Sequence, residues 1–483
     1  MLESTRTRGF GLWQPIRWSS PGRSLRLWPR RRRPEGRSTQ EAGPWLKPAR
    51  VFLLLFLLVD LVGTGLLMSS WATTSGGGLD FTSALFTATT SLAVCGLSIV
   101  SIGDDLSTWG QGVVLALMQI GGMGIMTLAA LLGTAVIHRF GLRMQLNVQA
   151  ETRSLWIGDV RGVVSRVLII FAVVQGAVFV LVTPRLWLGY DMGLGEASYV
   201  GLFHSISAFN NAGLSLYDDS LTRFSGDALV LFPVVCAVIL GGIGFPVLIE
   251  LRRHIRAPRR WSLHTKITVT TALVLFTAGA VLVTLMEWDN PDTLGQLSGW
   301  AKITDGLFHG VMPRSGGLNV VETGQMQDST LLLTIMLMFV GNGSAGTAGG
   351  IKVATLAVIF LVILAEVRGQ DQVHVYGRQL PSEVIRQALS LVFLSATIVA
   401  VSTVLLVHTT AFSLTQVLFE TTSAFAVVGL STGITGDLPQ WAQILLAVLM
   451  VAGRVGPITF VTALAFRERH RRYQLAEARP IIG

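Results

Sequence analysis

Four copies of one short pattern divide the chain into comparable quarters, and this repeat limits the possible folds more than any other feature. In each copy, Leu-Phe stands nine or ten residues before Gly-Leu, and the Gly-Leu pairs begin at Gly96, Gly213, Gly317 and Gly429. Chance could supply one such pair, but not four evenly spaced copies in equivalent surroundings. The pattern therefore predicts four tandem structural units with the same motif at the centre of each.

Apolar stretches flank every copy of the motif. A helix needs roughly 20 apolar residues to span a bilayer, and only 13% of the 483 residues are charged, whereas soluble domains carry about 25%. We therefore expect an all-α polytopic membrane protein with eight full spans. The expected spans cover roughly residues 51–72, 110–137, 164–188, 228–251, 266–287, 329–365, 387–411 and 438–465.

The helical segment before each Gly-Leu pair is too short to cross the membrane. Residues 82–92, for example, make a helix of about 16 Å, which has to enter from one face and return. Glycine suits the return turn because it reaches positive φ without a Cβ clash, and four return strands around an axis can offer backbone carbonyls to an ion. The predicted architecture is four helix–pore loop–helix repeats around one central pore.

The repeat pattern also predicts the domain boundaries. We expect a basic cytoplasmic arm, four repeats, of which the third contains an intramembrane loop at 341–350, and a C-terminal tail. Glycine-rich signatures recur in the second spans of three repeats, at 121–124, 241–244 and 453–456, where they favour close helix packing. The boundaries are 1–50 for the arm, 51–138, 139–256, 257–370 and 371–470 for the repeats, and 471–483 for the tail.

Positive charge gathers in the arm and in alternate interhelical segments. The arm contains Arg30–Arg33, and further basic groups fall at 139–166, 252–266, 368–386 and 467–472. The positive-inside rule places these segments and both termini in the cytoplasm. A polybasic segment before the first span is typical of contact with anionic membrane lipids, which we favour over nucleic-acid binding.

A soft polar segment interrupts the second span of the third repeat. Five glycines stand among its ten residues, and polar backbone at membrane depth has to face protein or a water-filled cavity. A movable gate and a static kink that eases packing are the two interpretations, and the gate is favoured. The segment comprises Gly341, Asn342, Gly343, Ser344, Ala345, Gly346, Thr347, Ala348, Gly349 and Gly350.

These motifs together resemble a known family. "SAFNNAGL" (207–214), "PRSGGL" (313–318), "AGTAGGIK" (345–352) and "GRVGPITF" (453–460) are similar to motifs of the membrane, or pore, subunit of the Trk/Ktr/HKT superfamily of potassium transporters. The likeness covers residues 50–483 and is greatest to the bacterial Ktr-type subunit. The ending "RPIIG" of this chain resembles the C-terminus of that subunit. The arm lies outside the likeness.

The resemblance implies a potassium selectivity filter. The four Gly-Leu glycines match the filter glycines of the family, and members with Ser in the first position tend to favour sodium, so four glycines point to K⁺ as the transported ion. Na⁺ remains open as a coupling or activating ion. The implied filter residues are Val94, Cys95, Gly96, Asn211, Ala212, Gly213, Ser315, Gly316, Gly317, Val427, Val428 and Gly429.

Two arginines and one glutamate stand in apolar surroundings. Arg454 lies deep in its span, where a charge costs at least about 2.5 kcal/mol, and it matches the family's pore arginine, which implies a role in the gate. Arg314 and Glu420 occupy the filter regions of repeats three and four, and we expect them to pair behind the filter and brace it. For Cys95 there are two alternatives: a thiol that is accessible from outside, or a small buried residue.

The expected function is potassium uptake across the plasma membrane by a non-enzymatic, multi-pass pore subunit. The resemblance implies a homodimer regulated by a cytosolic ring of nucleotide-binding subunits. A sodium-selective or sodium-coupled transporter of the same fold is the alternative, and a secondary transporter for an organic solute is a more distant one. An intramembrane enzyme is disfavoured because the sequence has no HExxH motif and no convincing nucleophile–base pair.

Overall fold

The computed structural model describes residues 48–124, 160–370 and 372–456, which all belong to one compact unit, Pro44–Gly483. Several predictions concern residues outside these ranges. These predictions concern nearly all of the arm 1–50, the basic segments at 139–159 and 467–472, and the tail 471–483. The repeat boundaries themselves also stay predictions.

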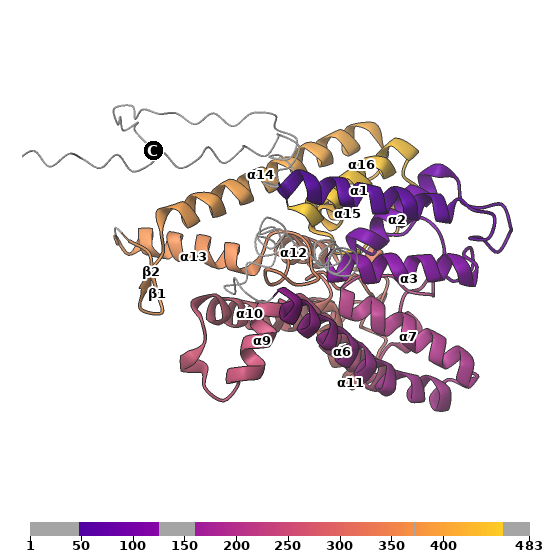
Figure 1. Ribbon diagram of the computed structural model, residues 1–483, viewed down its shortest axis with the longest axis horizontal. Coiled ribbons are helices and arrows are strands. Elements are labelled where there is room, and N and C mark those ends of the chain that lie inside the picture. The colour runs from indigo at the N-terminus through magenta and orange to yellow at the C-terminus, as the bar shows by residue number, and fades with distance from the viewer. Residues whose placement is uncertain (1–47, 125–159, 371, 457–483) are drawn as a thin grey trace, which may run out of the picture. The chain divides into compact units, whose positions relative to one another are not determined.

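The described residues form fourteen α-helices and one short hairpin (Figure 1). Each of the four repeats contributes one short helix just before its Gly-Leu pair, and we call these four the short helices. They are α2 (Phe81–Ala93), α7 (Leu194–Asn210), α11 (Gly299–Val311) and α15 (Leu414–Ala426). The helices that flank them are α1 (Pro48–Leu67), α3 (Thr108–Met123), α6 (Val160–Gly189), α8 (Ala228–Gly242), α9 (Phe245–His254), α10 (Leu263–Glu287), α12 (Asp328–Phe339), α13 (Val353–Val367), α14 (Ser382–Thr409) and α16 (Gln440–Val455).

The four short helices lead into tight turns, and two of them, α2 and α15, begin at side-chain caps. Asp80 caps α2 by accepting hydrogen bonds from the backbone N–H groups of Thr82 and Ser83, and Ser413 forms a capping box with Gln416 at the start of α15. Such caps satisfy backbone donors that a helix leaves unpaired at its N-terminus. Sequence therefore defines where α2 and α15 start, even though each has only 13 residues.

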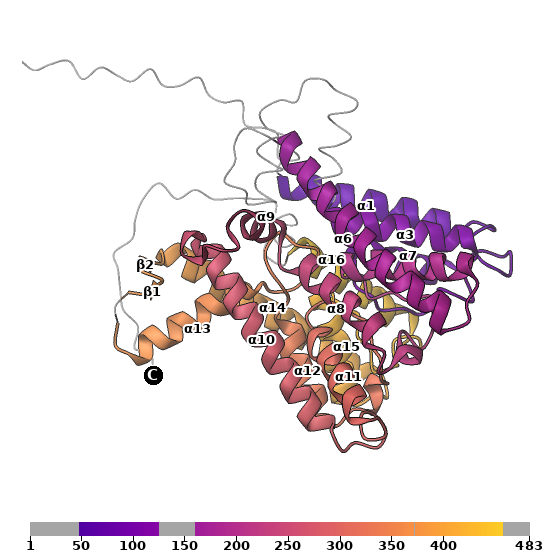
Figure 2. The ribbon, with the colours of Figure 1, turned by 90° about the horizontal axis from the view of Figure 1, so that it is seen from below.

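The helix contacts close a ring. Within a repeat, each short helix packs on the helix before it, as α2 does on α1 and α7 on α6. Between repeats, the second helix of one unit packs on the short helix of the next. These pairs are α3 with α7, α8 with α11, α12 with α15, and α16 with α2, and Figure 2 shows the neighbouring α3, α6 and α7. The fourth repeat thus returns to the first.

Within the described ranges, three helices are long and apolar enough to cross a membrane, namely α6 from Val164, α10 and α14. A fourth span arises if α8 and α9 are joined, although the chain bends there by 103°. Shorter apolar helices, α1, α12, α13 and α16, accompany them. The chain is thus rich in membrane-type helices, and the total of eight spans stays a prediction.

The second helix of the third repeat is interrupted by a longer non-helical segment than the bend between α8 and α9 in repeat two. After α12 ends at Phe339, the chain runs through residues 340–352 without helix and then resumes as α13. The β1–β2 hairpin (His374–Val375 with Arg378–Gln379) follows α13 and leads to α14 (Figure 1). The break coincides with the glycine-rich segment of the sequence.

Candidate functional site

Each short helix leads into a turn that uses left-handed backbone. The turn residues, which stand two positions before the Gly-Leu glycines, all have positive φ, with values of 61° at Val94, 60° at Asn211, 76° at Ser315 and 57° at Val427. This conformation is unfavourable for a valine. It persists only when surrounding structure imposes it, and such strain is typical of functional sites.

The four Gly-Leu glycines approach one another closely. A Cβ atom added to Gly96 would lie 3.0 Å from Cα of Gly213 and 3.1 Å from Cα of Gly429, and one added to Gly213 would lie 2.8 Å from Cα of Gly317. All four glycines also have positive φ. No side chain can therefore be accommodated at these positions without displacing a neighbouring repeat.

Backbone carbonyl oxygens border the same cluster of glycines. A Cβ atom on Gly429 would meet the oxygen of Cys95 at 2.2 Å, one on Gly96 would meet that of Ala212 at 2.8 Å, and one on Gly317 would meet that of Val428 at 2.4 Å. In each case the oxygen belongs to the residue just before the glycine of a neighbouring repeat. The arrangement brings carbonyl oxygens from separate repeats to one place, as cation coordination requires.

Hydroxyl groups of three short helices hold the return strands. The N–H of Gly96 donates to Oγ1 of Thr90 at 3.0 Å, and the N–H of Gly429 donates to Oγ of Ser423 at 3.1 Å. In the second repeat, Ser207 donates instead to the carbonyl of Leu214 at 2.6 Å. Sequence analysis missed these residues, although the shared hydroxyl six positions before three of the glycines is a visible signal.

In repeats two and three, a buried histidine fastens the strand that leaves the glycine. In repeat two, Nε2 of His204 lies 3.0 Å from Oγ of Ser215, and in repeat three, Nε2 of His309 accepts from the N–H groups of Val320 and Val321, both at 3.2 Å. Both histidines are buried. These hydrogen bonds explain the two histidines as structural residues that hold the strand after the glycine.

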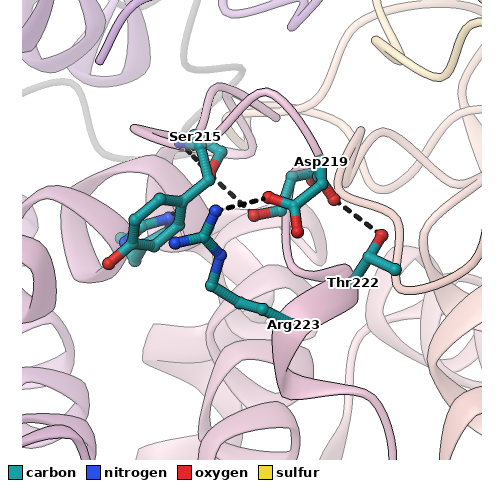
Figure 3. Close-up of polar contacts among 7 residues, drawn as sticks. Ser215, Asp219, Thr222 and Arg223 are labelled. Carbon is teal, nitrogen blue, oxygen red and sulfur yellow. Dashed lines mark hydrogen bonds and ion pairs between the residues drawn. The ribbon is translucent and has the colours of Figure 1, made fainter. Parts of the chain in front are cut away.

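Polar contacts continue into the loop that follows Ser215 (Figure 3). The guanidinium of Arg223 pairs with Asp219 at 3.0 Å and stacks over the ring of Tyr217 at 3.5 Å. Thr222 donates its hydroxyl to the carbonyl of Asp219 at 2.6 Å, and Ser215 donates to the carbonyl of Ser220 at 2.9 Å. The strand after Gly213 is therefore anchored from both sides.

Glycines of the second helices pack directly on the ends of the short helices. A Cβ atom would lie 2.0 Å from the carbonyl oxygen of Leu92 if it were added to Gly121, and 2.0 Å from that of Phe209 if it were added to Gly241. For Gly453, the corresponding distance to the oxygen of Phe425 is 1.7 Å. Close packing therefore explains these three glycines.

Loop 341–350 lies against the ends of three short helices. Its N–H groups at Gly343 and Thr347 donate to the carbonyls of Gly242 and Gly241, at 2.9 and 3.1 Å. The hydroxyl of Thr347 donates to Oδ1 of Asn211 at 3.1 Å, and the N–H of Gly349 donates to Oγ of Ser315 at 3.3 Å. On the side of repeat four, a Cβ atom on Gly349 would lie 2.5 Å from Cβ of Val427.

Arg454 connects the loop to two repeats. One terminal nitrogen of its guanidinium donates to the carbonyl of Thr347 and the other to that of Gly121. Lys352, at the far end of the loop, donates to the carbonyl of Ala348 at 2.6 Å. Both cations therefore satisfy carbonyls of the segment that breaks the second helix of repeat three.

The amino-acid sequence of this chain matches the sequence model of a protein family. The model of the TrkH family, whose description is cation transport protein, matches residues 56–472. The chain belongs to the TrkH family of cation transport proteins. As a member of this family it is a multi-pass membrane protein.

Relatives of this TrkH-family chain match along nearly all of their length. It is 36% identical over 428 residues to Ktr system potassium uptake protein B of Bacillus subtilis (strain 168), covering 88% of this chain and 95% of the relative. Identity to the protein of the same name from Vibrio alginolyticus is 38% over 422 residues, or 86% and 91% of the two chains. The fold also matches the crystal structure of the potassium transporter TrkH from Vibrio parahaemolyticus, with a TM-score of 0.67, 17% identity, and coverage of 87% and 86%.

Arg314 and Glu420 do not form the ion pair that the sequence suggested. Arg314 donates to the carbonyl of Gly341 at 2.5 Å and lies over the ring of Phe276 at 4.9 Å. Glu420 accepts from Ser431, Thr432 and Thr435 of its own exit strand, at 2.6 to 3.3 Å. Both side chains are fully buried and bind within their own repeats, but Nε and one terminal nitrogen of Arg314 have no hydrogen-bond partner among the described residues.

This arrangement gives Glu420 the same position and the same task as the two histidines. His204 and His309 also reach from a short helix to the strand after the glycine. Thr87 occupies the corresponding place in repeat one, and among the described residues its hydroxyl has no hydrogen-bond partner. The exit strand is therefore fastened by a side chain at this position in three repeats.

Cys95 is a small buried residue in the TrkH framework. Its side chain is inaccessible, and Sγ lies 3.9 Å from the carbonyl of Ser423. Its carbonyl oxygen, by contrast, faces the cluster of glycines. The structure therefore favours the buried alternative for the thiol.

Proposed function

We propose that the chain is the pore-forming subunit of a potassium uptake system in the plasma membrane. The observation that carries this function is the meeting of four glycines and the neighbouring carbonyl oxygens of Cys95, Ala212 and Val428. Carbonyl oxygens from several strands can replace the hydration shell of K⁺. The relatives named as potassium uptake proteins support the same ion.

In this proposal the filter consists of the turn residues, the glycines and the residues between them. The four segments are 94–96, 211–213, 315–317 and 427–429. The closed ring of helix contacts supports a single central passage, with each segment held by its own short helix and by a neighbouring repeat.

A growth and uptake experiment tests the proposed function. The chain is expressed, with and without a cognate cytosolic subunit, in a bacterial host that lacks potassium uptake systems. We expect growth on limiting potassium that sodium cannot replace, and uptake of radioactive rubidium. Gly96→Ser should weaken both, because its Cβ would lie 2.8 Å from the oxygen of Ala212.

Gly65→Ser is the matched control, since a Cβ atom at Gly65 on α1 meets no atom within 4 Å. It should leave growth and uptake unchanged. Good expression without any cation flux, in all pairings, would contradict a potassium pore. Flux of sodium in preference to potassium would instead favour the sodium-selective alternative.

Loop 341–350, together with Arg454, is proposed as the gate of this pore. Its hydrogen bonds to several repeats hold it across the ends of the short helices. Glycine-rich backbone can change conformation at little steric cost. The gate can therefore open by exchanging these bonds for water.

Loss of the arginine contacts tests the gate. Arg454→Gln shortens the reach to Thr347 and Gly121 and removes the charge, so the initial rate of rubidium uptake per protein molecule should rise several-fold. If the loop is a static kink, this variant should transport at the wild-type rate or more slowly. Protein in the membrane is quantified in parallel, so that abundance and rate are separated.

Regulation by a cytosolic nucleotide-binding ring and assembly as a homodimer complete the proposal. The exposed end of α9 and the turn after it carry Arg252, Arg253, Arg256, Arg259 and Arg260, which suit an acidic docking face. Helix α9 also connects to the gate, because the N–H of Phe245 donates to the carbonyl of Ala345 at 3.1 Å. The relatives named above are components of a Ktr system, in keeping with such assembly.

These assembly features are open to direct measurement. Mass photometry of the purified protein in nanodiscs should give the mass of two chains. Reporter fusions at both ends should report a cytoplasmic location. A mass of one chain, or an external terminus, would contradict the proposed assembly or topology.

A further inference from the structure

The four turn residues divide into two chemical pairs. Val94 and Val427 are apolar, whereas Asn211 and Ser315 are polar. All four side chains are fully buried, and all four backbones have the same left-handed conformation. Backbone geometry alone therefore does not explain why two of the four repeats place a polar side chain at this position.

Both polar turn residues bind loop 341–350. Asn211 accepts a hydrogen bond from the hydroxyl of Thr347, with 3.1 Å between Oδ1 and Oγ1. Ser315 accepts from the N–H of Gly349 at 3.3 Å and also donates to the carbonyl of Val427 at 2.7 Å. Ser315 thus joins the loop to the strands of two repeats with a single hydroxyl group.

The apolar turn residues contact glycines of the second helices. Methyl groups of Val94 and Val427 lie against the helix glycines Gly121 and Gly453, where an added Cβ would be 2.8 and 3.1 Å away. Oδ1 of Asn211 likewise lies 2.8 Å from a Cβ added to the helix glycine Gly241, so the two pairs differ in their hydrogen bonds to the loop and not in this helix contact. Val427 also touches the loop, because a Cβ added to Gly349 would lie 2.5 Å from its Cβ, but the hydrogen bonds between turn side chains and the loop are made by Asn211 and Ser315.

We propose that Asn211 and Ser315 are positioning residues that make ion discrimination depend on where loop 341–350 lies. The inference rests on the proposed potassium pore and adds to it a coupling between gate and filter. A loop movement that clears the passage has to break the bonds from Thr347 and Gly349. Ser315 then keeps its bond to the carbonyl of Val427 but loses its bond to the loop, and the position of this carbonyl relaxes.

Competition measurements test the coupling. Rubidium uptake is measured in the presence of increasing potassium or increasing sodium. The half-inhibitory concentration of sodium divided by that of potassium gives the selectivity for potassium, independently of the amount of protein. Ser315→Ala and Thr347→Val should each reduce this ratio by about fivefold, the factor that corresponds to one net hydrogen bond. Ser205→Ala is the control, because this buried hydroxyl bonds only to the carbonyl of Leu202 in its own helix.

The outcomes separate this inference from the proposed function. A lowered ratio in both variants, with the wild-type ratio in Ser205→Ala, supports the coupling. An unchanged ratio in Thr347→Val, even if its uptake is faster, would show that the loop only blocks the passage, and would overturn the coupling while leaving the potassium pore intact. A wild-type protein that does not discriminate between the two ions would overturn both. Because Thr347→Val leaves all filter residues in place, the test holds even if Ser315→Ala fails to fold.

Discussion

Repeat three differs from the other three at the place where the second helix meets the short helix. In repeats one, two and four, a helix glycine packs on a carbonyl oxygen at the end of a short helix, as Gly453 does on Phe425. In repeat three the helix α12 already ends at Phe339, before the glycine-rich segment, and Arg314 binds the carbonyl of Gly341 in the loop instead. The hydroxyl that precedes three of the glycines is also replaced, by Val311.

The difference shows how one architecture can combine rigidity with motion. Tight backbone contacts in three repeats allow almost no displacement, because packed interiors do not deform continuously. Hydrogen bonds to a glycine-rich loop can be exchanged for bonds to water in a passage. The molecule therefore concentrates its freedom in one quarter of the ring, and the following predictions test that division.

Gly453→Ala should have the largest effect on folding. Its Cβ would lie 1.7 Å from the oxygen of Phe425, and relief requires separation of α16 from α15. We expect destabilisation of about 3 kcal/mol, at the upper end for an overpacked site, measured as thermal unfolding in detergent.

Two matched variants make this test specific. Gly341→Ala in the broken helix should be less damaging, because its Cβ would meet the oxygen of Gly349 in the soft loop at 2.2 Å. Gly112→Ala on α3, where an added Cβ meets nothing within 4 Å, should be neutral or mildly stabilising. Equal losses at Gly453 and Gly341 would refute the division into rigid and movable quarters.

Glu420→Gln should have the next largest effect. The carboxylate accepts from Ser431, Thr432 and Thr435, and the amide can reproduce only part of this set. We expect a loss of about 2 kcal/mol in unfolding free energy, as for hydrogen bonds to a charged group. Uptake should fall as the strand after Gly429 loosens.

The charge swap Arg314→Glu with Glu420→Arg sharpens the same point. Since each residue is bound within its own repeat, the double variant should be no better than the worse single variant in stability or uptake. Rescue by the swap would show that the two side chains do interact, and would restore the ion pair suggested by the sequence.

Ser423→Ala should have a smaller effect, because it leaves one N–H group, that of Gly429, without its hydroxyl acceptor. The expected loss is about 1 kcal/mol. If the filter binds K⁺, added potassium raises the melting temperature by mass action, and this rise should be reduced in the variant. Ser395→Ala, whose hydroxyl bonds only to the carbonyl of Leu391 within α14, is the control and should keep the full potassium effect.

Local features of the fold could be predicted from the sequence, whereas partners between distant segments could not. Repetition of Leu-Phe and Gly-Leu predicts a short helix near 82–92, and α2 runs from Phe81 to Ala93. The glycine-rich break at 341–350 was equally visible. The partners of Glu420 were not, because they depend on how the strand after Gly429 folds back on its own helix. Charge alone suggested Arg314, but several nearby hydroxyl and N–H donors already satisfy the carboxylate.

Asp80→Ala should have the smallest effect, because it removes a cap at the rim of the ring rather than a contact inside it. Asp80 accepts from the N–H groups of Thr82 and Ser83 at 3.1 and 3.2 Å, and loss of such an exposed cap costs about 0.5 kcal/mol, the lower end of the range for caps. Hydrogen bonding, chiefly from Ser83, holds the pKa of Asp80 below its ordinary value. The stabilisation is therefore complete above the ordinary carboxyl pKa and disappears as the pH falls through the lowered one.

Thermal unfolding of Asp80→Ala and wild type at neutral and acidic pH measures this contribution. The difference between the two proteins should shrink in acid, where the carboxylate of the wild type is protonated. Ser298→Ala, at the start of α11, is the control, because its side chain makes no capping bond and should contribute little at either pH. A loss at Asp80 as large as that at Gly453 would mean that the rim is as rigid as the interior, and the contrast between the repeats would have to be attributed to something other than backbone packing.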